Sequence, residues 1–331
     1  MPLLLTEADV KSILKMPMAI EAVEDSFRRL GDGSALLHSR QRLHVPGKSY
    51  IHYMAAADAT TGYMGLKIYT SAREGLRFLV PLFQAESGDL VAIIEANYLG
   101  QMRTGAASGV ATRVLARSDA RTIGIIGTGL QARTQLEAIA QVREIKSVRA
   151  FGRDRGRREE FAAEMTKRLE ISVTTVTSAE EAVRDADVVV TSTTSTNPVL
   201  EGRWLKPGMH VNAIGANFPN RRELDDEAVR RSHVIAADSR AQSKMEAGDL
   251  MRFFGDDDSR WSFVQELSEI VAGKTPGRTS AEQITLFRSN GIAIEDIVVA
   301  GRIYELARER GLGKQIAMWE EEVRLSGARS V

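Results

Sequence analysis

The second half of the chain alternates between short apolar segments and segments with a helical pattern. The predicted strands are "TIGIIG" (122–127), "SVRAFGR" (147–153), "SVTTVTS" (172–178), "DVVVTST" (187–193), "HVNAIGAN" (210–217) and "HVIAAD" (233–238). Amphipathic or polar segments that fit helices lie between most of them. Apolar strands that alternate with helices form a parallel sheet covered on both faces, so this half predicts a doubly wound α/β domain.

One strand-to-helix junction in this half carries a glycine turn, "IGTGLQA" (126–132). Gly127 allows a tight turn, Gly129 lets a pyrophosphate approach the backbone, and Ala132 lets the helix pack close to the strand. The free N–H groups at the helix N-terminus suit phosphate oxygens. The junction predicts a dinucleotide site that includes Gly127, Gly129 and Leu130; the alternative is a glycine-rich turn that holds no ligand.

The next strand ends in "FGRD", Phe151 to Asp154, where a dinucleotide-binding domain contacts the ribose. Gly152 stands where an acidic residue would bind a free 2′-hydroxyl, and Arg153 follows it directly. A guanidinium matches a 2′-phosphate in shape and charge, so the sequence favours NADP(H). NAD(H) stays possible, because Asp154 could serve as the acid and Arg153 could belong to a solvated helix start.

The first part of the chain has a different sequence pattern. Short apolar segments separated by Gly, Pro or Asp between residues 40 and 92 predict an antiparallel sheet. A helix is predicted before it, over 18–30 with its stop at Gly31-Asp32-Gly33, and another after it, over 97–116. The apolar segment 292–313 predicts a last helix that could return to this first part.

The composition of the chain argues against several classes of partner and chemistry. A chain of 331 residues predicts two domains. Lys+Arg and Asp+Glu both number 44 and form no long block, which argues against a nucleic-acid or membrane partner. The absence of cysteine excludes disulfides and thiolate chemistry, and the five histidines lack metal-ligand spacing, so no metal is expected. With no apolar run of about 20 residues, a cytoplasmic protein is expected.

Six motifs in this order resemble the ornithine cyclodeaminase/mu-crystallin family. They are "GYMGLKIYT" (62–70), "RTGAAS" (103–108), "IGTGLQA" (126–132), "KPGMHVNAIGAN" (206–217), "RRELDDE" (221–227) and "GIAIEDIVVAGRIYE" (291–305). The resemblance implies an α/β fold in which a Rossmann NAD(P)-binding domain is inserted into an α+β substrate-binding and dimerisation domain. It implies residues 1–117 plus 301–331 for the substrate domain, 118–300 for the Rossmann domain, and a homodimer.

The resemblance also implies site residues. An Arg of an early strand, a Lys after a glycine and the Arg of "RTGAAS" become Arg42, Lys67 and Arg103 as catalytic residues that hold the carboxylate of a small amino or imino acid. Arg40 is the alternative to Arg42. Lys67 alternates with apolar neighbours as the polar face of a strand would, and it could also donate a proton if burial beside two arginines lowers its pKa. Each of these cations could instead lie in solvent. The implied cofactor contacts beyond the turn are Thr104, Gln131, Thr193, Thr194, Ile214 and Asn217.

Asn217 departs from the cyclodeaminase pattern, which has an aspartate there to handle substrate amino groups. An amide cannot take up a proton as a carboxylate does. The nearby acids Glu223, Asp225 and Asp226 fit a helix start instead. The sequence therefore favours NAD(P)H-dependent reduction of a cyclic ketimine, Δ1-pyrroline-2-carboxylate or Δ1-piperideine-2-carboxylate, to L-proline or L-pipecolate. The alternatives are an ornithine cyclodeaminase, an alanine dehydrogenase-like enzyme and a non-catalytic ligand binder.

Overall fold

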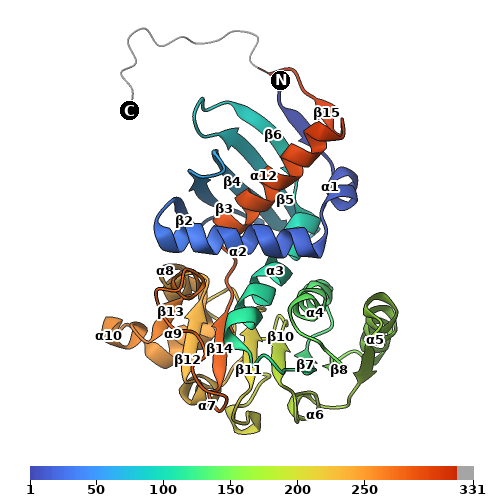
Figure 1. Cartoon of the computed structure of the whole chain (residues 1–331), viewed down its shortest axis with the longest axis vertical. Coiled ribbons are helices and arrows are strands. Elements are labelled where there is room, and N and C mark those ends of the chain that lie inside the picture. Colours follow the sequence, from blue (N-terminus) through green and yellow to red (C-terminus); the bar gives the residue numbers. More distant parts are fainter. Residues whose placement is uncertain (319–331) are drawn as a thin grey trace.

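The computed structural model describes residues 1–318, which form two β-sheets at opposite ends of the molecule (Figure 1). The strands of the first sheet, in spatial order, are β15 (Lys314–Gln315), β1 (Leu3–Leu5), β6 (Leu90–Glu95), β5 (Gly75–Gln84), β4 (Tyr63–Ala72), β3 (Ser49–Asp58) and β2 (Ala35–Val45). Strands β2 to β6 are antiparallel neighbours, which confirms the sheet predicted between residues 40 and 92, and β1 adds to β6 in parallel. Helix α1 (Glu7–Ile13) follows β1 in the chain.

Helix α12 (Ala293–Glu309) lies across one face of this sheet (Figure 1). Two glycines permit its close approach. A Cβ at Gly65 would lie 2.8 Å from Ile297 Cδ1, and one at Gly301 would lie 2.9 Å from Tyr63 Cδ2. The face of the sheet under α12 is therefore an inner face, and it continues past the N-terminal end of the helix toward the second sheet.

The inner face corrects one prediction. Lys67 lies on it and is only 2% exposed, whereas its apolar neighbours Leu66 and Ile68 are half-buried on the outer face. The alternation was predicted correctly, but the face with the lysine is the buried one. This inversion is tolerated because Lys67 meets a carboxylate there, as described below.

The second sheet is parallel throughout, as the sequence predicts. Its spatial order is β13 (Val264–Glu266), β12 (Val234–Ala237), β14 (Thr285–Arg288), β11 (His210–Ala213), β10 (Val188–Thr191), β7 (Thr122–Ile126), β8 (Ser147–Phe151) and β9 (Ser172–Thr175). The run β9-β8-β7-β10-β11 is the strand order of a dinucleotide-binding fold, with its reversal between β7 and β10. Strands β13 and β14 are not predicted by the sequence pattern.

Helices cover this sheet and join it to the first. They are α4 (Leu130–Val142), α5 (Arg155–Leu169), α6 (Ala179–Val183), a 3-10 turn (Gly202–Trp204), α7 (Asp226–Arg231), α8 (Arg240–Glu246), α9 (Gly248–Phe254), α10 (Asp258–Trp261) and α11 (Leu267–Val271). Within residues 1–318 no helix has both the length and the apolarity that crossing a membrane requires.

Helices α2 (Met16–Asp32) and α3 (Asn97–Leu115) lie between the two sheets (Figure 1). Helix α2 ends within the predicted segment Gly31-Asp32-Gly33: the helix continues to Asp32, and Gly33 in the left-handed conformation is its C-cap. Gly31 serves packing, because a Cβ there would lie 2.5 Å from the backbone oxygen of Ser268. Helix α3 matches its prediction within one residue and is buried over most of its length.

The chain enters the second sheet after α3 and returns to the first through α12. We propose a substrate domain on the first sheet and a nucleotide domain on the second. The predicted junction at 300/301 falls inside α12, so we place it just before Ala293, where the helix begins. The part of the predicted substrate domain after residue 318 lies outside the described residues.

Candidate functional site

The glycine turn follows β7, next to the point where the strand order reverses. Gly127 has φ +102°, and a Cβ there would lie 2.5 Å from the backbone oxygen of Ser192. Gly129 is the N-cap of α4, with nothing within 4 Å of a Cβ position, and Leu130 is 65% exposed. The N-terminus of a 13-residue helix thus faces open space without a side-chain cap, an arrangement that can receive phosphate oxygens.

The other predicted cofactor residues lie around this turn on neighbouring elements. Thr193 and Thr194 follow β10, Ile214 and Asn217 follow β11, and Gln131 is in the first turn of α4. Carboxyl ends of parallel strands share one edge of the sheet, so these loops lie along the same edge as the turn. Thr104 is on α3, and its backbone oxygen accepts a hydrogen bond from Gln135 of α4 at 3.1 Å.

Glu223 holds two of these loops together, a role that the sequence did not reveal. The side chain is fully buried and accepts hydrogen bonds from Thr193 N (2.5 Å), Thr191 Oγ1 (2.9 Å) and Gly215 N (2.7 Å). Burial raises the pKa of Glu223, against hydrogen bonds from Thr193 that lower it. Its prediction as part of a helix start is wrong, since α7 begins at Asp226.

The two neighbouring acids behave as predicted. Asp225 is the N-cap of α7, accepting from Ala228 N at 2.7 Å, and Asp226 lies in its first turn. The sequence carries no local signal for the role of Glu223, because the three groups that donate hydrogen bonds to it lie up to 32 residues away in the chain.

Replacing Glu223 with glutamine is expected to weaken cofactor binding about tenfold. The amide places a donor where an oxygen now accepts from a backbone N–H, and leaving one buried N–H unpaired costs about 1–3 kcal/mol. Calorimetric titration with NADPH and NADH measures the effect, and circular dichroism checks folding. Glu201→Gln, at an exposed glutamate that pairs with Arg203, is the control. Unchanged cofactor affinity in a folded Glu223→Gln protein would contradict the role.

Four cations meet near the N-terminal end of α12, and we call Arg40, Arg42, Lys67 and Arg103 the cation cluster. Lys67 Nζ donates to Asp296 Oδ1 at 2.7 Å, and Arg103 Nε donates to the same oxygen at 3.1 Å. Arg103 Nη1 also pairs with Glu295 Oε2 at 2.8 Å. Both acids come from the first turn of α12, so this helix positions the two cations.

Both arginines of β2 join the cluster, and both pair with the buried Glu246 of α8. Arg40 is buried and donates to the backbone oxygens of Asn290 (3.0 Å) and Gly291 (2.8 Å). Arg42 is less buried and donates to the backbone oxygen of Asn217 at 3.0 Å. The structure therefore brings Arg42 to the predicted cofactor loop and Arg40 to the segment that leads into α12.

The cations of the cluster outnumber the acids that pair with them directly, and the buried Asp238 also attracts Arg103. Its four cations pair with three acids, Glu246, Glu295 and Asp296. Several buried polar atoms here also lack a partner within the described chain; they are Arg40 Nε, Arg42 Nε, His52 Nδ1, Asn290 Oδ1, Glu295 Oε1 and Asp296 Oδ2. Buried polar atoms are normally paired, so the four gathered cations and the unpaired atoms together fit a small polar ligand that carries a carboxylate.

Burial tunes the acids and bases of the cluster. Burial, followed by repulsion from Arg103, lowers the pKa of Lys67 to about 8, while Asp296 opposes the shift. Burial raises the pKa of Glu295 to about 8, against the attraction of Arg103. Lys67 can therefore give up a proton near neutral pH, which an ordinary surface lysine does not do.

Three acids of the cluster were missed from the sequence. Glu246 carried no local signal. Glu295 and Asp296 did carry one, because two adjacent acids stand inside the apolar segment 292–313, where charge is tolerated only with partners.

The ribose end of the site has a distinct shape. A Cβ at Gly152 would lie 2.6 Å from Thr128 Oγ1, so an acidic side chain has no room there. The carboxylate of Asp154 caps α5 by accepting from Arg157 N at 2.8 Å. Arg153 is exposed, and its side chain makes no hydrogen bond or ion pair with any of residues 1–318.

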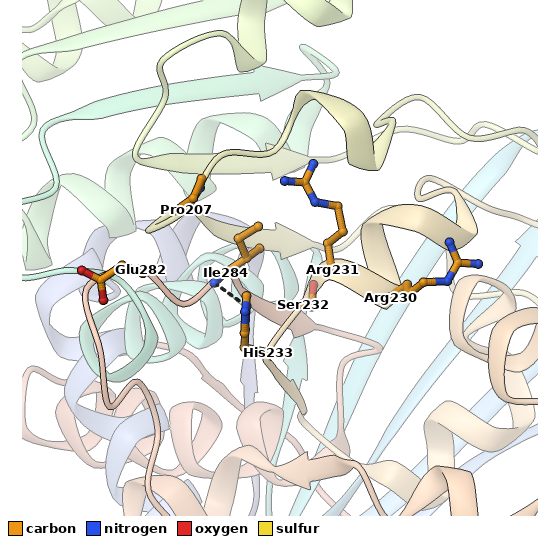
Figure 2. Close-up of a pocket in the computed structure, with 7 residues that line it drawn as sticks. All are labelled: Pro207, Arg230, Arg231, Ser232, His233, Glu282 and Ile284. Carbon is orange, nitrogen blue, oxygen red and sulfur yellow. Dashed lines mark hydrogen bonds between the residues drawn. The ribbon is translucent and has the colours of Figure 1, made fainter.

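A surface pocket of about 300 Å³ lies elsewhere (Figure 2). It is lined by Pro207, Arg230, Arg231, Ser232, His233, Glu282 and Ile284. These residues precede or flank the amino ends of β11, β12 and β14, at the opposite edge of the sheet from the glycine turn. His233 Nδ1 accepts from Ile284 N at 3.1 Å, so the ring of the histidine already has a partner. The pocket is not part of the candidate site.

Known proteins share the fold of this chain. A Δ1-pyrroline-2-carboxylate reductase of Bacillus cereus is 36% identical over 261 residues, covering 76% of this chain and 80% of its own. The structure of Thermococcus litoralis Δ1-pyrroline-2-carboxylate reductase with NADH and L-proline superposes with a TM-score of 0.90 at 36% identity, covering 95% of this chain and all of that one. An archaeal alanine dehydrogenase dimer with bound NAD gives 0.89 at 34% identity, covering 96% and 99%. Residues 1–311 match the family model itself. This chain belongs to the ornithine cyclodeaminase/mu-crystallin family.

Proposed function

We propose that the protein is an NAD(P)H-dependent reductase of cyclic ketimines that converts Δ1-pyrroline-2-carboxylate or Δ1-piperideine-2-carboxylate to L-proline or L-pipecolate. The observation that carries the proposal is a buried lysine of lowered pKa that lies in one cluster with three arginines. The Bacillus cereus relative is a Δ1-pyrroline-2-carboxylate reductase, and the Thermococcus litoralis reductase structure contains NADH and L-proline.

The residues of the chain fit a bound dinucleotide. The turn at Gly127 and Gly129 would hold the pyrophosphate, and the loops that Glu223 joins would line the nicotinamide end. When bound, NAD(P)H supplies the hydride that reduces the carbon of the C=N bond.

The cation cluster supplies orientation and a proton. Arg103 and an arginine of β2 hold the substrate carboxylate, which fixes the imine carbon in place. Lys67 Nζ donates a proton to the imine nitrogen, because a protonated imine accepts hydride more readily. The unpaired Asp296 Oδ2 can accept a hydrogen bond from that nitrogen once it is protonated.

An ornithine cyclodeaminase is less well supported. Residue 217 is an asparagine whose backbone oxygen accepts from Arg42, and it offers no carboxylate for a substrate ammonium. The three acids that pair with the cluster, Glu246, Glu295 and Asp296, are already engaged by its arginines and lysine. A preformed imine, which has no free amino group to be eliminated, suits this arrangement better.

One assay tests the proposal. Purified protein is mixed with NADPH or NADH and each cyclic imine, and the absorbance of the reduced cofactor is followed. Consumption of the cofactor with formation of proline or pipecolate is the expected result. Proline and ammonia from ornithine without net cofactor change would instead identify a cyclodeaminase. Absence of both reactions would leave a ligand-binding protein.

We propose NADP(H) as the preferred cofactor, although the solved structures named above contain NADH or NAD. The crowding of Gly152 by Thr128 and the use of Asp154 as a helix cap leave no acid for a free 2′-hydroxyl. In this proposal the guanidinium of Arg153 binds the 2′-phosphate of NADP(H).

Replacing Arg153 with alanine is expected to raise the KM for NADPH about tenfold and to leave the KM for NADH within about twofold, since one charge-assisted phosphate contact is lost. Steady-state kinetics with both cofactors measure the ratio. Arg155→Ala is the control, because Arg155 is also exposed but pairs with Glu159. Equal losses with both cofactors would refute the contact with the 2′-phosphate.

We also propose a homodimer formed through the outer face of the first sheet. That face carries exposed apolar side chains, among them Leu43, Tyr53 and Leu79. Exposed apolar patches on a sheet mark interaction sites, and the archaeal alanine dehydrogenase is a dimer. Sedimentation at twice the 36.3 kDa chain mass is expected, and a monomer would contradict it.

A further inference from the structure

A row of stacked rings crosses the inner face of the first sheet beside the cation cluster. His52 of β3 pairs in register with Tyr69 of β4, which pairs with Phe78 of β5. The rings of His52 and Tyr69 are 4.2 Å apart at an interplanar angle of 2°, and those of Tyr69 and Phe78 are 4.8 Å apart at 24°. We call these three residues the aromatic row.

The aromatic row adjoins the cations that would hold a substrate carboxylate. Arg42 of β2 pairs in register with His52, and Lys67 Nζ lies 5.4 Å from the centroid of the Phe78 ring. Phe218, from the loop after β11, meets His52 edge-on at 6.3 Å and lies 4.7 Å from the guanidinium of Arg42. A substrate whose carboxylate meets Arg42 and Arg103 and whose imine nitrogen meets Lys67 therefore has its remaining atoms beside these rings.

The side chains of the aromatic row carry no charge. Burial, together with the charges of Arg42 and Arg40, lowers the pKa of His52 to about 4, so its ring is neutral at physiological pH. His52 is 1% exposed, and its Nδ1 has no hydrogen-bond partner within the described residues. Buried nitrogens are normally paired, so this atom is free to bond to a ligand. Each carboxylate of the cluster already faces a cation, so a second positive charge on the substrate would meet repulsion.

We propose that the aromatic row, closed by Phe218, is the subsite for the substrate's side chain or ring. It selects α-imino acids whose side chain is apolar and flat over those whose side chain ends in a positive charge. The inference rests on the proposed function, because it assumes that the cation cluster binds the substrate carboxylate. Because the three rings stack on one another, their edges are left for a ligand, and a flat ring can lay its face against these edges in T-shaped contact. A desolvated cation beside Arg42 and Lys67 is repelled by both.

Binding of simple carboxylic acids tests this without turnover. Calorimetric titrations of the protein with saturating NADP⁺ or NAD⁺ compare 3-phenylpropionate, butanoate and 4-guanidinobutanoate. The phenyl acid is expected to bind at least about 10-fold more tightly than butanoate and about 100-fold more tightly than the guanidino acid. Equal affinities, a preference for the guanidino acid, or no measurable binding of the phenyl acid would overturn the proposal.

Variants assign the selectivity to the row. Phe78→Ala is expected to weaken binding of 3-phenylpropionate about tenfold while butanoate changes less than about threefold, and Phe78→Leu, which keeps apolar volume but not a flat face, is expected to fall between. Phe253→Ala is the control, at a half-buried phenylalanine of α9 packed between arginines. Equal losses for both acids in Phe78→Ala would remove the row from the subsite. Failure of the proposed function is recognised separately, as absence of imine-dependent cofactor oxidation despite selective binding of acids.

Discussion

Replacing Lys67 with arginine is expected to lower kcat for ketimine reduction by about 10²–10⁴-fold while the KM for the imine changes only a few-fold. The guanidinium keeps the positive charge beside Asp296, but it does not release a proton in the physiological range. A loss of this size is the ordinary contribution of a positioned general acid. Steady-state kinetics at pH 7 measure it, and thermal unfolding checks that the variant is folded.

The pH profile separates proton donation from simple charge. Because the pKa of Lys67 is about 8, the protonated, active form predominates below that pH and is lost as pH rises through it. The kcat of the wild-type protein should therefore fall above about pH 8 with the loss of one proton. The Lys67→Arg variant should lack this limb. A variant with kcat within about threefold of wild type, or with the same limb, would show that Lys67 contributes only charge.

Replacing Arg103 with leucine is expected to have the largest combined effect on stability and activity. Glu295 would lose its partner and Asp296 would keep only Lys67, although both acids are fully buried. Breaking a buried ion pair on one side costs about 3–5 kcal/mol of unfolding free energy. Loss of the carboxylate contact should also raise the KM for substrate and lower kcat, together by about 10²–10³-fold in kcat/KM.

A second substitution separates the two effects. Arg103→Leu combined with Glu295→Gln replaces the buried carboxyl group that lost its partner with an amide that does not ionise, so part of the stability should return while activity stays low. Arg113→Leu is the matched control on the same helix, since Arg113 is exposed and pairs at the surface with Glu24. Chemical denaturation and kinetics are measured on all three proteins. Recovery of activity in the double variant would mean that Arg103 acts only through stability, and would remove it from substrate binding.

Much of the nucleotide-binding half was predictable because its signals are local. The alternation of apolar strands with helices lies within short windows, and the turn at Gly127 depends on residues that are neighbours in sequence. The parallel sheet and the turn were predicted correctly for this reason. The four-residue strand β14 was not, because it follows a long irregular stretch and takes its place between β11 and β12 only through pairing with strands far away in sequence.

The candidate site shows the same division. The residue types of the cation cluster were visible in the sequence, and so was the absence of an acid at Asn217. Their partners were not, since the hydrogen bond between Lys67 and Asp296 spans 229 residues and that between Arg40 and Glu246 spans 206. Glu223 was misplaced on a helix start because its donors come from two other loops.

The sequence by itself determined the parallel sheet, the place of the glycine turn between β7 and α4, and the chemical types available to the site. The tertiary structure alone decided that Lys67 faces inward, that α12 supplies the acids beside it, and that three rings line up across β3, β4 and β5. The physical reason is that periodicity and turn chemistry act over a few residues, whereas a buried charge is stable only where the fold brings an opposite charge to it from elsewhere in the chain.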